Sequence, residues 1–128
     1  MSHRVLIALG SNHQPAAHIQ WASQRILWML ERNGGTDTGS TPRLSRRLWT
    51  TDIHGTGPHY LNRLILCDVG EARTANEIEA ALKAIEAETR RAPGRVTIDL
   101  DLMQYDEERY HLRDWPRPYI QQLLPDLQ

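Results

Sequence analysis

Apolar residues fall into short blocks along the chain, and the spacing within each block predicts the type of element. Residues 5–9 form a compact apolar run that closes at Gly10, which predicts a buried strand followed by a turn. Across residues 15–32 most apolar side chains lie three, four or seven positions apart, which is typical of an amphipathic helix. The helix should end at Gly34 and Gly35, because glycine tolerates the left-handed conformation of a helix cap.

Residues 43–103 again show strand patterns and a helix pattern. Residues 43–49 and 60–69 predict two strands, separated by a loop that contains glycine and proline. Thr74 opens a second helix, and Thr74 with Glu77 fits a capping box, in which each side chain satisfies an end amide of the helix. A Pro-Gly step then breaks the pattern before a last strand at residues 96–103.

The predicted order is strand, helix, strand, strand, helix, strand. This is the split βαβ arrangement of ferredoxin-like folds. We therefore expect an α+β fold in which one antiparallel sheet carries two helices on one face, as a single domain over residues 1–128. The tail, residues 104–128, contains three prolines and no long periodic segment.

Composition narrows the class of protein. A chain of 128 residues with 40% hydrophobic and 24% charged residues suits one soluble globular domain with a modest core. The net charge of −1 gives no reason to expect a nucleic acid or an acidic membrane as partner, and no apolar run reaches the roughly 18 residues of a membrane span. Cys67 is the only cysteine, so no internal disulfide can form and we expect a reduced, cytoplasmic protein.

Two aspartates alternate with aliphatic residues in the segment 98–102, Ile-Asp-Leu-Asp-Leu. Because side chains alternate along a strand, Asp99 and Asp101 should share one face, with Cα atoms roughly 6.5 to 7 Å apart. Two like charges this close favour a bound cation or a partner base. Since Mg²⁺ is usually held by one or two carboxylates together with substrate phosphates, this pair is a candidate metal site.

Three arginines, Arg90, Arg91 and Arg95, lie just before the aspartate pair. Guanidinium groups beside a metal-binding pair suit a polyphosphate ligand, so the combination favours Mg²⁺–ATP. The alternative interpretation is a strand whose outer face is simply solvated. The sequence has no P-loop pattern, so phosphate binding would depend on this different arrangement.

Other polar residues carry weaker signals. Tyr60 and Asn62 share one face of the strand predicted at 60–69, which makes them candidate pocket residues. None of the six histidines pairs with another at i, i+4, so structural or surface roles are favoured over a zinc site.

Taken in order, these features resemble the 6-hydroxymethyl-7,8-dihydropterin pyrophosphokinases of folate biosynthesis. Residues 7–12 (IALGSN) are similar to the opening strand and turn of that family, and residues 60–62 (YLN) match its Y-L-N segment. Glu86 stands where the family has a glutamate before the catalytic loop, and residues 98–102 match the core of the signature R-T-I-D-L-D-I. The resemblance covers about residues 4–103, with a weaker similarity at residues 117–127.

The resemblance implies a ferredoxin-like enzyme that transfers pyrophosphate from ATP to the hydroxymethyl group of the pterin. By that analogy Asp99 and Asp101 hold two Mg²⁺ ions that bridge the ATP phosphates. The residues that would line the pterin pocket are Thr50, Ile53, Tyr60, Asn62 and Tyr119. The residues at nucleotide-side positions are Lys83, Glu86, Arg91 and Arg117. Arg91 and Arg95 correspond to catalytic-loop arginines, with Arg95 one position out of register.

The chain departs from the family in the catalytic loop. The segment between Glu86 and Asp99 is shorter than in the family and carries no tryptophan. Closure of such a loop normally shields phosphoryl transfer from water. The sequence leaves three interpretations open: an active pyrophosphokinase, a non-catalytic module of the same family that binds pterin or nucleotide, and a ferredoxin-like interaction domain without a small-molecule site.

Overall fold

A computed structural model describes residues 2–32, 41–51, 59–89 and 97–128. Its elements in chain order are β1 (His3–Ser11), α1 (Pro15–Arg32), β2 (Arg43–Leu44), β3 (Leu48–Thr50), β4 (Tyr60–Val69), α2 (Ala75–Ala87), β5 (Asp99–Tyr105), β6 (Glu108–Arg109), α3 (Pro118–Leu123) and the 3₁₀ helix η1 (Leu124–Leu127).

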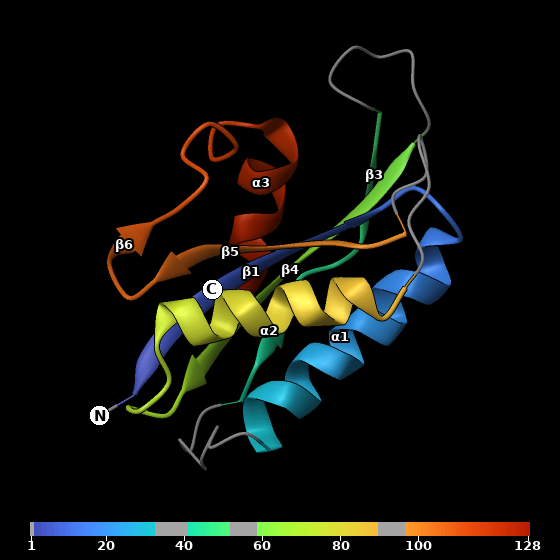
Figure 1. Cartoon of the computed structure of the whole chain (residues 1–128). Coiled ribbons are helices and arrows are strands. Elements are labelled where there is room, and N and C mark those ends of the chain that lie inside the picture. The colour runs from blue at the N-terminus through green and yellow to red at the C-terminus, as the bar shows by residue number, and fades with distance from the viewer. Residues whose placement is uncertain (1, 33–40, 52–58, 90–96) are drawn as a thin grey trace.

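The strands form one antiparallel sheet with β1 at its centre (Figure 1). The order across the sheet is β2-β4-β1-β5-β6, and β3 also pairs with β4. β1 pairs along its length with β4 and along most of it with β5, so these three strands form the main body of the sheet. Together with α1 and α2 they confirm the predicted α+β, ferredoxin-like fold.

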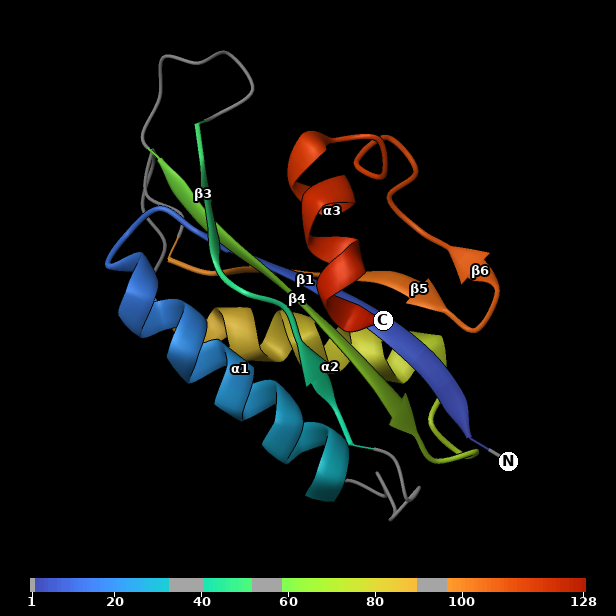
Figure 2. The same ribbon diagram turned by 180° about the vertical axis from the view of Figure 1, so that it is seen from behind.

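Helices α1 and α2 lie side by side on one face of the sheet, as Figures 1 and 2 both show. The main core fills the layer between them and the sheet, where the inward stripes of the helices meet alternate residues of β1, β4 and β5. Leu9 and Leu100 are almost completely buried in this layer. Burial of such a side chain contributes roughly 1.5–3 kcal/mol, so this layer dominates the stability of the fold.

The C-terminal segment covers the opposite face of the sheet, with α3 and η1 packed across it (Figure 2). Ile120 and Leu123 of α3 pack against Leu6 and Ala8 of β1, and Trp115 is buried with them. The sequence did not predict this layer, because a helix of six residues that begins at a proline is too short to show a periodic pattern. The sheet is therefore covered on both faces.

Two predicted boundaries need correction. The strand predicted at 43–49 is split into β2 and β3. At Ser45, between them, the amide donates to the Leu64 carbonyl (2.9 Å) while the hydroxyl accepts from the Leu64 amide (2.8 Å), so a side chain interrupts the backbone ladder. Gly10 and Ser11 belong to β1 and do not form a turn. The break predicted at the Pro-Gly step lies outside the described residues.

The start of α2 agrees with the threonine half of the predicted capping box. The Thr74 hydroxyl accepts a hydrogen bond from the Glu77 amide at 3.2 Å and satisfies one of the free amides at the helix start. Among the described residues, no helix is both long and apolar enough to cross a membrane.

Candidate active site

One end of the sheet carries small residues on β1, flanked by polar residues on both neighbouring strands. Gly10 lies opposite Asn62 of β4 and Asp99 of β5 in the strand register, and one pleat further Ala8 lies opposite Asp101. Residues that are directly opposed point to the same face of a sheet. Because the central strand contributes almost no side chain there, the register leaves a hollow with polar walls.

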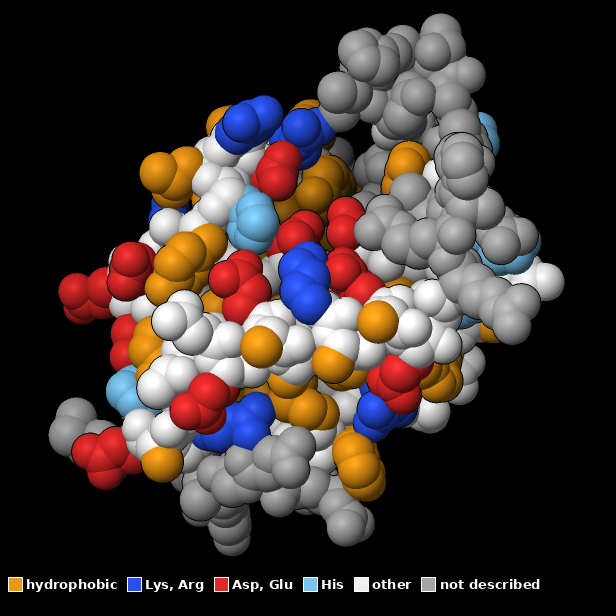
Figure 3. Space-filling model, in the orientation of Figure 1, with side chains coloured by type: hydrophobic (Ala, Val, Ile, Leu, Met, Phe, Trp, Pro, Cys, Tyr) orange, Lys and Arg blue, Asp and Glu red, His pale blue; other side chains and the backbone are white. Residues whose placement is uncertain are grey.

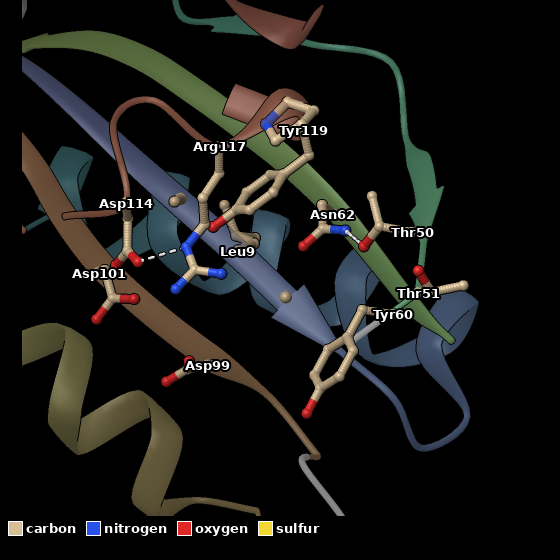
Figure 4. Close-up of a pocket in the computed structure, with 13 residues that line it drawn as sticks. Leu9, Thr50, Thr51, Tyr60, Asn62, Asp99, Asp101, Asp114, Arg117 and Tyr119 are labelled. Carbon is tan, nitrogen blue, oxygen red and sulfur yellow. Dashed lines mark hydrogen bonds and ion pairs between the residues drawn. The ribbon is translucent and has the colours of Figure 1, made fainter. Parts of the chain in front are cut away.

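This hollow is a cavity of about 680 Å³, within the usual size of small-molecule sites. The C-terminal segment forms its far wall, opposite β5 (Figure 4). Its lining consists of Ala8, Leu9, Gly10, Thr50, Thr51, Tyr60, Asn62, Asp99, Asp101, Asp114, Arg117, Pro118 and Tyr119. The fold thus joins an acidic wall to an aromatic and amide wall around one space.

The acidic wall is under electrostatic strain. Burial, the charge of Asp101, and then the hydrogen bond and charge of Glu86 raise the pKa of Asp99 to about 6, while Lys83 acts in the opposite direction. A cation bound at the pair would relieve this repulsion. The described residues contain no cluster of three or more histidine, cysteine, aspartate or glutamate side chains that could hold a metal alone.

Two carboxylates without further protein ligands fit Mg²⁺, because this ion keeps several positions for water and substrate phosphates. Asp99 and Asp101 are the residues that would hold it, and both point from β5 toward the cavity in Figure 4. The raised pKa of Asp99 agrees with a site that has excess negative charge.

Helix α2 supports the acidic wall from the edge of β5. β6 pairs with β5 only at Gln104 and Tyr105, so within the described part of the chain no strand meets the outer edge of Leu100. Glu86 Oε1 accepts from the Leu100 amide at 2.8 Å, and Lys83 Nζ donates to the Leu100 carbonyl at 2.8 Å. These two side chains take the place of a neighbouring strand and are not among the residues that line the cavity.

The wall formed by the C-terminal segment carries a guanidinium group and a phenol. Arg117 Nε donates to Asp114 Oδ1 at 2.8 Å, and Figure 4 shows Arg117 extending toward the strand of Asp99 and Asp101. Burial, reinforced by the charge of Asp114, raises the pKa of Tyr119 to about 12, so the phenol stays neutral. A guanidinium group opposite two carboxylates could bind a phosphate group, and the two carboxylates could hold a cation beside it.

The amide wall is positioned by β3. Asn62 Nδ2 donates to Thr50 Oγ1 at 2.8 Å and to the Leu48 carbonyl at 3.3 Å, as Figure 4 shows for Thr50. The amide nitrogen is therefore committed to the protein, and Asn62 Oδ1 faces Gly10, where a Cβ would lie 3.4 Å away. This leaves the carbonyl oxygen of a buried amide available to accept a hydrogen bond from a ligand.

Most of the residues named from the sequence lie around this cavity. Asp99, Asp101, Thr50, Tyr60, Asn62, Arg117 and Tyr119 line it, and Lys83 and Glu86 lie behind its acidic wall. Ile53, Arg91 and Arg95 lie outside the described residues. What each residue does in the site stays a prediction.

The sequence did not point to two polar residues near the carboxylates. Asp114 lines the cavity, and its only sequence signal is the three-residue spacing to Arg117. His111 has a positive φ of 53° and places Nε2 3.7 Å from both Asp101 Oδ1 and Glu79 Oε1. Figure 3 shows acidic side chains gathered over α2 and β5, with basic and histidine side chains among them.

The fold and this site define a ferredoxin-like α+β protein with a cavity of small-molecule size, one wall of which carries two carboxylates that could bind a cation. Residues 6–126 match the family model for 7,8-dihydro-6-hydroxymethylpterin-pyrophosphokinase (HPPK), and the chain therefore belongs to this family. A search among curated proteins found no match. Members of the family are diphosphokinases of folate biosynthesis that use ATP with Mg²⁺ and a pterin.

Proposed function

We propose that this chain transfers the pyrophosphoryl group of ATP to the hydroxyl of 6-hydroxymethyl-7,8-dihydropterin in a reaction that depends on Mg²⁺. The observation that carries the proposal is that one cavity combines the Asp99–Asp101 pair with the Asn62 amide, within a chain that matches the family over residues 6–126. In the reaction the pterin hydroxyl oxygen attacks the β-phosphorus of ATP. The bond from this phosphorus to the oxygen of the α-phosphate breaks, AMP leaves, and the hydroxyl proton passes to solvent.

The chain's own residues supply positioning and charge, the main needs of phosphoryl transfer. Mg²⁺ bound at Asp99 and Asp101 would neutralise charge that develops on the phosphates. Arg117, held by Asp114, would contact the phosphates from the opposite wall. Asn62, fixed by Thr50, would accept a hydrogen bond from the pterin ring.

The aromatic side chains suit a flat heterocycle. Tyr60 and Tyr119 both line the cavity, and the raised pKa of Tyr119, about 12, keeps its ring neutral beside the acidic wall. A pterin between aromatic rings gains stacking contact and is shielded from water. The expected position of the pterin is thus between β4 and α3, with its hydroxymethyl group toward Asp99.

An assay of AMP release with Mg²⁺, ATP and the pterin tests this proposal. Wild type should form AMP. Asp99→Asn and Asp101→Asn should lose at least about a hundredfold in rate, because the metal is no longer held. The control variant Glu107→Gln, at an exposed position, should behave as wild type. No AMP above the level of the two aspartate variants would overturn it. Calorimetric binding of pterin or nucleotide without AMP would instead identify a non-catalytic module, which the short segment between Glu86 and Asp99 favours.

A further inference from the structure

The chain contains fifteen basic residues, of which fourteen are arginines and one, Lys83, is a lysine. This single lysine lies against the acidic wall of the cavity. Arginine presents a planar fork, whereas lysine presents a compact point charge with three donors that can turn toward separate oxygens. The one position where this sequence uses lysine is therefore one where three oxygens converge.

All three of these oxygens belong to the protein. Lys83 Nζ lies 2.8 Å from the Leu100 carbonyl oxygen, 3.2 Å from Glu86 Oε1 and 3.5 Å from Asp101 Oδ1. An ammonium group has three hydrogens, so these acceptors account for all its donors. Lys83 is also absent from the cavity lining. The geometry gives it no free donor for a phosphate.

The charge around Lys83 is incompletely balanced. Asp99, Asp101 and Glu86 form a group of three neighbouring carboxyl groups, since Asp99 and Asp101 line one wall of the cavity and Lys83 Nζ contacts both Glu86 and Asp101. Lys83 Nζ contacts two members of this group, Glu86 Oε1 at 3.2 Å and Asp101 Oδ1 at 3.5 Å, and His111 Nε2 lies 3.7 Å from Asp101 Oδ1. Lys83 offsets part of the charge, and a divalent cation would have to bind against its repulsion.

We propose that Lys83 is a tethered counter-cation of the metal site, a positioning residue and not a nucleotide ligand. It fixes Asp101 and the edge of β5, and it keeps the affinity of the aspartate pair for a bare divalent cation low. The metal then binds mainly together with nucleotide phosphates, whose charge overcomes the repulsion by Lys83. This inference rests on the proposed function in one respect, that Asp99 and Asp101 form the metal–nucleotide site.

Titration with Mn²⁺, followed by electron paramagnetic resonance in the absence of nucleotide, tests the proposal. Lys83→Met should bind Mn²⁺ about fivefold or more tightly than wild type, because the repulsive charge is gone. Lys83→Arg keeps the charge and should bind weakly, like wild type. Arg4→Met, at the opposite end of β1, makes the same change in net charge and should also leave Mn²⁺ binding unchanged.

Nucleotide affinity in the absence of metal separates this role from that of a phosphate ligand. If Lys83 acts only through its charge, Lys83→Met should lose no more than about fivefold in ATP affinity in EDTA, and Lys83→Arg should bind ATP as wild type does. A much larger loss of ATP affinity in Lys83→Met, or Mn²⁺ binding by that variant no tighter than wild type, would overturn the proposal.

Because Lys83 is the only lysine, wild-type protein with selectively ¹⁵N-labelled lysine gives one side-chain ammonium signal. An ammonium group that donates three hydrogen bonds should exchange its hydrogens slowly enough for the signal to be observed at neutral pH. An exchange rate equal to that of free lysine would contradict the role of Lys83. This measurement uses wild-type protein, so it tests the proposal even if Lys83→Met fails to fold. These binding readouts do not involve AMP. An inactive protein that shows them contradicts the proposed function alone, whereas an active protein without them contradicts only the role of Lys83.

Discussion

The carboxyl group of Asp99 allows a test of the site that needs neither substrate. Burial and the neighbouring charge of Asp101, together with Glu86, raise its pKa to about 6, so above that pH an ionised group is held where ionisation is unfavourable. Asparagine keeps the shape of the side chain but removes the charge. We therefore expect Asp99→Asn to be more stable than wild type at pH 8.

The magnitude follows from the pKa difference. A rise from 3.8 to about 6 corresponds to ~3 kcal/mol, at 1.36 kcal/mol for each pKa unit. Because solvent reaches part of the Asp99 side chain, screening reduces the expected gain to about 1–2 kcal/mol. For a chain of this size, that gain corresponds to a rise in unfolding temperature of about 3–8 °C.

The sign of the pH dependence is also fixed. The pKa of Asp99 is higher in the folded state, so the unfolded state loses its proton first as the pH rises. Wild type therefore loses stability relative to Asp99→Asn between about pH 4 and pH 6, and the full difference is present above pH 6. Below about pH 4 the carboxyl is protonated in both states, and the two proteins should be equally stable.

Urea unfolding of wild type and Asp99→Asn in EDTA, at pH 8 and at pH 3.5, measures the gain in stability and its dependence on pH. Asp126→Asn is a control with the opposite sign, because the Asp126 carboxylate accepts hydrogen bonds from the Arg46 amide (2.8 Å) and guanidinium (2.7 Å) and its loss should destabilise the protein. The reasoning fails if Asp99→Asn is no more stable than wild type at pH 8. It also fails if the gain persists unchanged at pH 3.5.

Two further predictions concern other parts of the molecule. Gly10→Ala places a Cβ on the cavity floor, 3.4 Å from Asn62 Oδ1. It should lower pterin affinity, measured by calorimetry, at least about tenfold, while the free energy of unfolding changes by less than about 1 kcal/mol. Unchanged affinity would show that the pterin does not lie over Gly10. The hydrogen bond that His3 Nδ1 donates to the Asp106 carboxylate raises the pKa of His3, so the contribution of this pair is full below about pH 6 and is lost as the pH rises through the raised value. The difference in unfolding temperature between wild type and His3→Gln should therefore shrink from pH 5.5 to pH 9, and a constant difference would contradict this.

The long elements could be predicted because their patterns are set by burial. The stripe of α1 and alternate residues of β1 and β4 face the main core, so their spacing in sequence reflects the geometry of the fold. The covering of the other face could not be predicted in the same way. α3 has only six residues, and its burial depends on contact with Leu6 and Ala8, which lie far away in the sequence.

The site was partly predictable for a related reason. Alternation along β5 placed Asp99 and Asp101 on one face, and the register then brought them beside Gly10 and Asn62. The contacts of Lys83 could not be inferred from sequence, because they depend on where α2 crosses the open edge of β5. Asp114 was missed because a carboxylate three residues from an arginine most often marks an exposed ion pair.

Residues 98–102, at the start of β5, explain why the fold tolerates this charge cluster. Ile98, Leu100 and Leu102 are almost completely buried beneath Asp99 and Asp101, and each such side chain contributes roughly 1.5–3 kcal/mol. That burial exceeds the ~1–2 kcal/mol that ionised Asp99 is expected to cost. Because side chains alternate along the strand, the charged residues that destabilise the fold lie on one face and the buried aliphatic residues that stabilise it lie on the other. A substitution on the cavity face can therefore remove metal binding without unfolding the protein, which is why the aspartate variants can test function and stability independently.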